Sequence, residues 1–241
     1  HLQDVWINPQ NPMSKVYGSG SVGLLASVFR NIETANFRVL DESGEVVREI
    51  GQHTNIRKEF RMGTVVPYTF FTNGVWDGTL DGHPVNDGET YTYQVEFLRT
   101  KDSSPQVLEF ELKVDNTGPA VSNVEYDADT YTLSFDASDA LSGVDYFVIE
   151  SAVDSGKYIT AEDTPELVGK EGEARYSVNV QSILENESQT QFYIYGYDKA
   201  GSISALITGA VDPLRPEDVV TPDPDPNPEV ATHTVTGDVV V

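Results

Sequence analysis

The stretch VWDGTLDGHPVNDGETYTYQVEF, residues 75–97, is the part of the sequence that decides the fold class. Several glycine-containing turn signals lead into an alternating run of apolar and polar residues at 91–97. Asp-Gly pairs favour tight turns with positive φ, and period-two alternation is typical of a strand with one buried face. The stretch predicts antiparallel β-structure and a structural turn motif made of Trp76, Asp77, Gly78, Asp87 and Gly88. We expect Trp76 to pack over the turn into the core, because aromatic side chains gain most from burial.

The same alternation continues on both sides of this stretch. Leu108, Phe110, Leu112 and Val114 alternate with charged residues, and a breaker cluster follows at Asp115-Asn116-Thr117-Gly118-Pro119. Further strands are predicted around residues 37–39, 46–50, 56–60, 131–135, 144–148, 176–180, 192–197 and 203–207, with one helical turn in 181–188. The pattern predicts an all-β chain of two tandem immunoglobulin/fibronectin-III-like antiparallel sandwiches followed by a spacer rich in proline and aspartate.

Four segments follow from these signals. We expect a first sandwich at 1–117, a second at 118–212, an acidic proline-rich linker at 213–231 and the start of a truncated further module at 232–241. Proline fixes φ and like charges repel, so the linker should be extended and semi-rigid. We expect the chain to be a piece of a longer protein.

Composition excludes several classes of function. The 241 residues contain 39 Asp and Glu against 15 Lys and Arg, a net charge of −24, which repels nucleic acids and anionic membranes. The absence of cysteine excludes disulfides, thiolate metal sites and thiol catalysis. The longest apolar run, Val22–Phe29, is too short to span a membrane, so no membrane insertion is expected.

An ordered set of motifs resembles a known family. The set comprises Phe29–Ile32, Phe37–Asp41, Gly44–Val47, Trp76–Gly78, Asp87-Gly88, Tyr91–Tyr93, Val114–Pro119 and Tyr197–Gly201. It is similar to the fibronectin-type-III-like accessory modules of cell-envelope subtilisin-like serine proteases, the group of lactocepin and the complement-cleaving surface peptidases. The resemblance covers roughly residues 15–210, and Ser202 stands where the family usually has asparagine. It implies an exported, bacterial cell-surface or cell-wall parent with serine endopeptidase activity.

The chain itself shows no sign of catalysis. A subtilisin-like site needs separate Asp, His and Ser motifs, and neither Gly-Thr-Ser nor His-Gly-Thr occurs in the sequence. The four histidines, His1, His53, His83 and His233, have no serine motif nearby. We therefore expect this segment to have no catalytic residues and to bind no organic cofactor.

Calcium is the one cofactor that the sequence keeps as a candidate. Asp136, Asp139 and Asp145, with Ser142, form one candidate oxygen-ligand cluster, and Asp77, Asp81 and Asp87 form another. Neither has the spacing of an EF-hand, and turn chemistry explains both clusters more simply.

The function expected is that of a non-catalytic accessory region. It would act as a structural spacer for an intramolecular protease domain and as an exosite for a large protein substrate, in a monomeric protein. One alternative is an adhesin or glycan-binding module, which predicts an exposed aromatic patch. Another is a calcium-stiffened spacer, which predicts a rise of the melting temperature with calcium.

Overall fold

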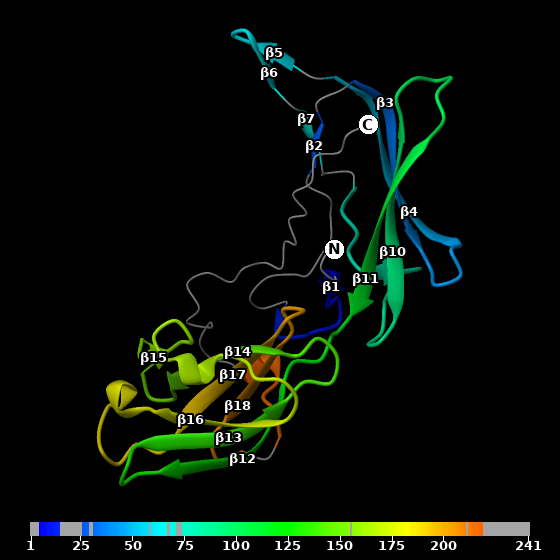
Figure 1. The fold of residues 1–241 in the computed structure, drawn as a ribbon. Coiled ribbons are helices and arrows are strands. Elements are labelled where there is room, and N and C mark those ends of the chain that lie inside the picture. The colour runs from blue at the N-terminus through cyan, green and yellow to red at the C-terminus, as the bar shows by residue number, and fades with distance from the viewer. Residues whose placement is uncertain are drawn as a thin grey trace. The chain divides into compact units, whose positions relative to one another are not determined.

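The computed structural model describes residues 5–14, 26–28, 31–57, 59–66, 68–70, 74–154, 156–210 and 212–218. These residues divide into two compact units. The first contains the described residues up to Pro9 and between Ser21 and Val114, and the second contains those from Gln10 to Ser14 and from Asp115 onward. Strands in several sheets dominate both units, so the predicted all-β class is confirmed (Figure 1).

The first unit is built on a five-stranded sheet with the order β1-β11-β10-β3-β4. Its strands are β1 (Val5–Ile7), β3 (Ile32–Leu40), β4 (Val46–Ile56), β10 (Thr90–Leu98) and β11 (Gln106–Val114). Neighbours pair antiparallel except β1, which pairs parallel to β11. Three two-stranded sheets accompany it: β2 (Ala26–Val28) with β7 (Tyr68–Phe70), β5 (Glu59–Arg61) with β6 (Thr64–Val66), and β8 (Thr79–Leu80) with β9 (His83–Pro84).

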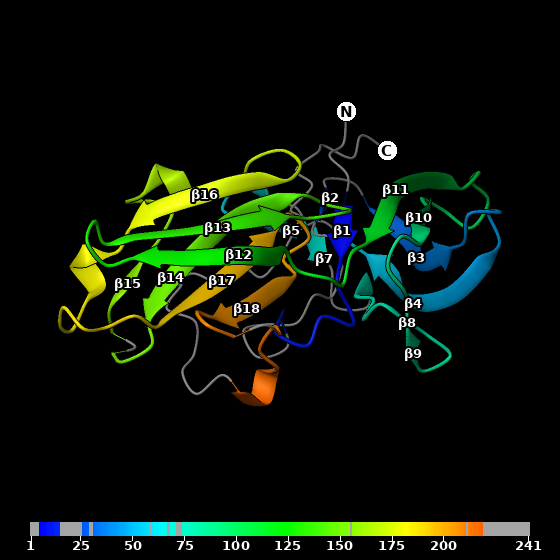
Figure 2. The same cartoon turned by 90° about the horizontal axis from the view of Figure 1, so that it is seen from below.

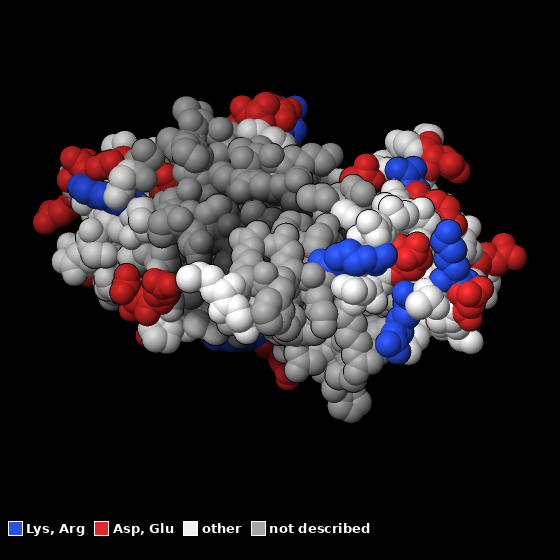
Figure 3. Space-filling view, turned by 90° about the horizontal axis from the view of Figure 1, so that it is seen from above, with Lys and Arg blue, Asp and Glu red and all other residues white. Residues whose placement is uncertain are grey.

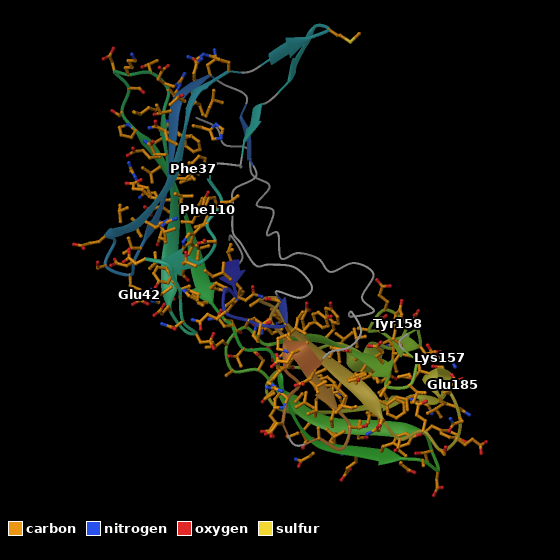
Figure 4. The ribbon with its side chains drawn as sticks, turned by 180° about the vertical axis from the view of Figure 1, so that it is seen from behind. Phe37, Glu42, Phe110, Lys157, Tyr158 and Glu185 are labelled. Atoms are coloured by element: carbon orange, nitrogen blue, oxygen red, sulfur yellow. The ribbon has the colours of Figure 1, made fainter. Side chains whose placement is uncertain are left out.

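The core of the first unit lies on one face of the large sheet. Alternate residues of β3 and β10 are fully buried there, and β11 places Leu112 and Val114 on the same side. Figure 4 labels Phe37 on β3 and Phe110 on β11, which both belong to this apolar cluster. Trp76 and Val85, from the turn-rich segment between β7 and β10, complete it. In residues 91–97 and 108–114, more buried and more exposed side chains thus alternate in the structure as the sequence predicts.

The second unit consists of two sheets. One has the order β12-β13-β16 and the other β15-β14-β17-β18. The strands are β12 (Ala120–Asp127), β13 (Thr132–Ser138), β14 (Val144–Ser151), β15 (Tyr158–Ile159), β16 (Ala174–Asn179), β17 (Phe192–Asp198) and β18 (Ile203–Ile207). The unit also contains the short 3-10 helices η2 (Pro165–Leu167), η3 (Gln181–Ile183) and η4 (Pro216–Asp218).

These two sheets share one hydrophobic core and lie as two layers (Figure 2). Phe135 of β13 meets Phe147 of β14 edge to face at 4.9 Å between ring centroids, and it stacks on Tyr176 of β16 at 5.5 Å. Aromatic pairs of this geometry stabilise a core beyond their buried area. The layered packing fixes the loops at the ends of the strands.

The outer face of the four-stranded sheet carries a second apolar cluster. Tyr195 and Tyr197 of β17 pack there with Val148, Ile203 and Met13. The stacked rings of Tyr146 and Tyr197 lie 4.5 Å apart at an interplanar angle of 10°. Because Met13 is only 2% exposed, the segment from Gln10 to Ser14 is part of this unit's packing.

Most of the predicted linker and all of the predicted C-terminal module lie outside the described residues. The structure describes residues 212–218 and no residue from 219 to 241.

Candidate functional site

The three aspartates predicted as a metal site have different surroundings. Asp136 lies on β13, accepts a hydrogen bond from Asn123 Nδ2 at 2.7 Å and forms an ion pair with Arg175 at 3.1 Å. Its pKa is lowered, chiefly by the Asn123 hydrogen bond and then by Arg175. Asp145 is an exposed residue of β14. Asp139, by contrast, is half-buried and lies beside two other carboxylates.

The cluster that the fold assembles consists of Asp115, Asp139 and Asp198. One carboxylate oxygen of each lies within 4.8 Å of those of the other two. Asp115 follows β11, Asp139 begins the loop between β13 and β14, and Asp198 ends β17. All three residues belong to the second unit. Within the described part of the chain, no other group of three or more acidic or histidine side chains has this geometry.

Backbone N–H groups orient Asp115 and Asp139. Asp139 Oδ1 accepts hydrogen bonds from the N–H of Leu141 at 3.1 Å and of Gly143 at 2.7 Å. Asp115 Oδ1 accepts one from Thr117 at 3.2 Å, and its Oδ2 accepts one from Ser142 at 2.9 Å. The last of these bonds crosses from one loop to the other, so it holds the two carboxylates in fixed positions.

Asp198 is the most enclosed member of the cluster. Its side chain is buried, with 1% of the residue exposed, and its Oδ1 accepts hydrogen bonds from Ala200 N at 2.9 Å and Ser202 N at 2.8 Å. Its Oδ2 is also buried and has no hydrogen-bond partner. Native proteins rarely leave a buried polar atom in that state, so this oxygen calls for a physical explanation.

The electrostatics of the cluster are unfavourable to three charges. Burial, followed by repulsion from Asp115, raises the pKa of Asp198 to about 9. Burial also raises the pKa of Asp139. Among the described residues, none of the ion pairs involves a carboxylate of this cluster. The arrangement therefore concentrates acidic groups that are held by backbone hydrogen bonds and, in the part of the chain that the structure describes, form no ion pair.

The sequence places Asp139 in a predicted metal site, but it places Asp115 in a breaker cluster and Asp198 in the motif Tyr197–Gly201. The three residues do share one local signal, because each accepts a hydrogen bond from the N–H two residues later. That signal is common in turns of all kinds, so it could not have separated these aspartates from others. Their convergence depends on the sheet topology, which joins residues far apart in the chain.

In the predicted turn motif, Trp76 and Asp77 both form local bonds. Trp76 is 1% exposed, donates from Nε1 to the Thr79 carbonyl at 2.9 Å and meets Tyr91 edge to face at 5.6 Å. Asp77 Oδ1 accepts hydrogen bonds from Thr79 N at 3.0 Å and Thr79 Oγ1 at 2.7 Å. The Asp77 carboxylate is therefore engaged in closing a turn.

The glycines of the motif occupy positions that suit glycine. Gly78 has φ of +76°, and a Cβ atom there would lie 2.6 Å from Pro9 Cβ. Gly88 has φ of +79° and donates its N–H to the Val114 carbonyl at 3.0 Å. Asp87, just before it, is exposed. Positive φ is costly for most other residues, so these turns depend on their glycines.

Two of the four histidines lie in the described residues. His83 Nδ1 lies 3.0 Å from the carbonyl oxygen of Asp81, at the β8–β9 turn. The ring of His53 lies edge-on to Phe37 with centroids 6.4 Å apart. Both are placed by local structure, and His1 and His233 lie outside the described residues.

The described surface is acidic and has few exposed aromatic groups. Figure 3 shows Asp and Glu on several separate parts of one face, with fewer Lys and Arg. Tyr158, labelled in Figure 4 beside Lys157 and Glu185, is the aromatic member of the exposed large apolar side chains in the described chain. Trp6 is half-buried, with Lys113 Nζ 5.7 Å from its ring centroid.

A shallow groove in the first unit is lined by acidic residues. It lies along the β3–β4 hairpin and the facing parts of β10 and β11, and Glu42 of this hairpin is labelled in Figure 4. The acidic residues along it are Asp41, Glu42, Glu109 and Glu111. Asp41 is engaged in the hairpin, where its Oδ1 accepts bonds from Ser43 and Glu45. No helix in the described residues has the length and apolar character needed to cross a membrane.

Comparisons with known proteins give one informative relationship. No protein-family model matches the sequence. The chain is 30% identical over 129 residues to the PI-type proteinase of Lactococcus lactis subsp. cremoris, and 30% identical over 129 residues to the PII-type proteinase of Lacticaseibacillus paracasei. In both cases the match covers 49% of this chain and 7% of the proteinase.

Among solved structures, the chain is similar to the apo structure of Bacteroides uniformis beta-glucuronidase 3. The match covers 77% of this chain and 23% of that chain, with 10% identity and a TM-score of 0.21. A likeness at this level supports no argument about function. The relationship on which a functional argument can rest is therefore similarity to a small part of bacterial proteinases.

Proposed function

We propose that this chain is a non-catalytic accessory region of a cell-surface, subtilisin-like serine proteinase, where it acts as a spacer and as an exosite for large protein substrates. The observation that carries the proposal is the 129-residue match, which covers half of this chain but 7% of each proteinase. A segment that small need not contain the residues that cut peptide bonds.

The structure of the first unit supports a scaffold role. Trp76 lies in the core and Asp77 closes a turn, so the most distinctive sequence motif of the unit serves packing and turn formation. Hydrolysis by a serine proteinase needs a nucleophile, a base and an orienting acid in contact with one another. The two histidines described here are placed by a turn carbonyl and by an aromatic ring. We infer that catalysis in the parent belongs to another part of it.

The proposed mechanism is geometric. Units with their own packed cores keep a constant length and orientation, and thereby set the position of whatever is attached to them. A large substrate can touch both a catalytic domain and an accessory unit, while a short peptide reaches only the catalytic domain. Binding energy gained at such a remote contact can be used to orient the scissile bond.

The acidic groove of the first unit is the surface we propose for that contact. Glu42 and Glu109 line it, and neither takes part in the hydrogen bonds that close the hairpin. A groove of this charge would favour basic segments of a substrate and would lose affinity at high salt.

The first test uses the parent proteinase with residues 5–218 deleted. Hydrolysis of a short chromogenic peptide should stay within about twofold of the intact enzyme, and kcat/KM for a large protein should fall by about tenfold. The isolated chain, incubated with both substrates, should cleave neither. Cleavage by the isolated chain would show that the region is catalytic, and equal losses on both substrates would remove the exosite role.

A second variant separates the exosite from the spacer. Glu42→Gln with Glu109→Gln in the parent should lower kcat/KM for a basic protein substrate and leave the peptide unchanged, because the length of the spacer is unaffected. Glu171→Gln with Glu187→Gln, at two exposed positions of the second unit, removes the same charge and is the matched control. A control that lowers protein hydrolysis equally would show that only diffuse charge matters.

A further inference from the structure

The cluster of Asp115, Asp139 and Asp198 contains a buried oxygen that the protein leaves without a partner. Asp198 Oδ2 has no hydrogen bond, although the residue is only 1% exposed. Its sister oxygen Oδ1 is held by two backbone N–H groups, and a half-turn of the symmetric carboxylate would leave the other oxygen in the same place without a partner. An orphaned buried acceptor beside two further carboxylates is what an oxygen-coordinated cation would satisfy.

We propose that Asp115, Asp139 and Asp198 bind one calcium ion. The site is a local property of the second unit and is independent of the proposed function.

The distances suit an ion of this size. Calcium–oxygen bonds are about 2.3–2.6 Å long, so two oxygens on opposite sides of one ion are at most about 5 Å apart. The three carboxylates each offer an oxygen within 4.8 Å of the other two. A single ion between them can therefore be reached by all three without moving the loops apart.

The chemistry of the ligands favours calcium over other metals. The cluster offers only carboxylate oxygens, and the chain has no cysteine. Zinc and copper prefer nitrogen or sulfur ligands, whereas calcium takes oxygen ligands in flexible numbers and completes its shell with water. Asp139 is half-buried, which leaves one side of the cluster open to solvent.

The loops around the cluster are already organised for binding. Ser142 N donates to Asp115 Oδ2 at 2.9 Å, and Lys199 N donates to the Gly143 carbonyl at 3.0 Å. These bonds join the segment after β11, the loop before β14 and the turn after β17. A preorganised site loses little conformational entropy when the ion binds.

The consequence would be a calcium-dependent increase in the stability of the second unit. An ion that binds the folded state and not the unfolded chain stabilises it by mass action. The ion would also offset the burial and the repulsion that make ionised carboxylates unfavourable in this cluster.

The test is calorimetry on the whole chain after removal of metal with a chelator. Titration with CaCl2 at physiological salt should show one site, and the melting temperature of the second unit should rise by about 5 °C or more in saturating calcium. Asp198→Asn and Asp139→Asn should each abolish both effects. Asp163→Asn removes the same charge at an exposed position and should leave both effects intact.

Three results would overturn the proposal. One is the absence of both binding heat and a melting shift in the wild type. Another is an unchanged calcium response in both Asp198→Asn and Asp139→Asn, which would show diffuse binding to the acidic surface. The third is an equal loss of response in Asp163→Asn. Circular dichroism of each metal-free variant verifies folding, so that a lost response is not mistaken for an unfolded protein.

Discussion

At the scale of single residues, Asp198 shows how one buried group can conflict with the rest of a fold. Its Oδ1 accepts two hydrogen bonds that close the turn after β17, while its Oδ2 is buried without a partner and the residue lies beside Asp115 and Asp139. The turn therefore needs the oxygen of an aspartate or asparagine, but it has no need of the negative charge. A neutral side chain of the same shape would keep the turn and avoid the cost of burying an ionisable carboxyl beside Asp115 and Asp139.

Asp198→Asn should therefore stabilise the chain when metal is absent. The amide oxygen can take the place of Oδ1, and the NH2 group can donate to the neighbouring carboxylates from the place of Oδ2. We expect the free energy of unfolding in chelator to rise by about 1–3 kcal/mol, measured by urea denaturation. Asp198→Ala, which removes the turn bonds as well, should lower it. Destabilisation by the asparagine variant would mean that the charge itself is needed in the metal-free fold.

Trp76 is the residue on which the packing of the first unit depends most. It is 1% exposed and contacts both the turn carbonyl of Thr79 and the ring of Tyr91. Trp76→Ala should cost about 3–5 kcal/mol, because a large cavity remains and the Thr79 carbonyl loses its donor. Trp6→Ala is the matched control, since that indole is half-buried under Lys113, and it should cost clearly less. Equal losses in denaturant titrations followed by circular dichroism would contradict this ranking.

At the scale of elements, the alternation of apolar and polar residues predicts the strands well where one face of the strand is exposed to solvent and the other is buried. Residues 91–97 and 108–114 follow that pattern in β10 and β11, and the structure buries the faces expected. The pairing of the strands with one another was harder to predict from the sequence. The parallel pairing of β1 with β11 joins residues more than a hundred positions apart. β1 has three residues, which are too few to show an alternation from which the strand could be predicted.

The carboxylate cluster could not be predicted for the same reason. Local turn chemistry identifies an aspartate that closes a loop, but it does not tell which loops meet. Asp139 was assigned to a metal site with its neighbours in sequence, Asp136 and Asp145, whereas the fold sets it beside Asp115 and Asp198. Side chains that are close in sequence on a strand and its following loop can point to different surroundings, as the ion pair of Asp136 with Arg175 shows.

The start of β14 depends on a close backbone approach at Gly169. Its N–H donates to the Asp145 carbonyl at 2.7 Å, and a Cβ atom there would lie 2.0 Å from the carbonyl oxygen of Val144. Gly169→Ala must therefore displace the segment that follows η2, at a cost of about 1–3 kcal/mol in unfolding free energy. Glu171→Ala, two residues later and exposed, should change the value by less than about 0.5 kcal/mol. A melting temperature unaffected by Gly169→Ala would show that this segment shifts without cost.

At the scale of the whole molecule, the order of the sequence and the order of the units do not coincide. Residues 10–14 precede the first unit's sheet strands β3 to β11 in the chain, yet they belong to the second unit. Asn11 explains why. Its Nδ2 donates to the carbonyls of Asn116 at 2.9 Å and Ile203 at 3.2 Å, and its Oδ1 accepts from the N–H of Ser14 at 2.7 Å and of Ile203 at 3.3 Å. Residues 10–14 resemble a polar loop in the sequence, but their hydrogen bonds make them part of the packed structure of the second unit.

Asn11→Ala should therefore destabilise the second unit, although the residue lies far in sequence from the strands of that unit. The substitution leaves several buried backbone groups without partners, and each such group costs about 1–3 kcal/mol, so we expect a loss of about 2 kcal/mol or more in the unfolding free energy of that unit. Pro12→Ala, in the same segment but exposed, is the control and should change stability by less than about 1 kcal/mol. Hydrogen exchange followed by mass spectrometry can assign the loss, because peptides from β17 and β18 should exchange faster while those from β3 and β10 stay unchanged. Faster exchange in the first unit's strands, with β17 and β18 protected as before, would show that residues 10–14 do not stabilise the unit to which the contacts assign them.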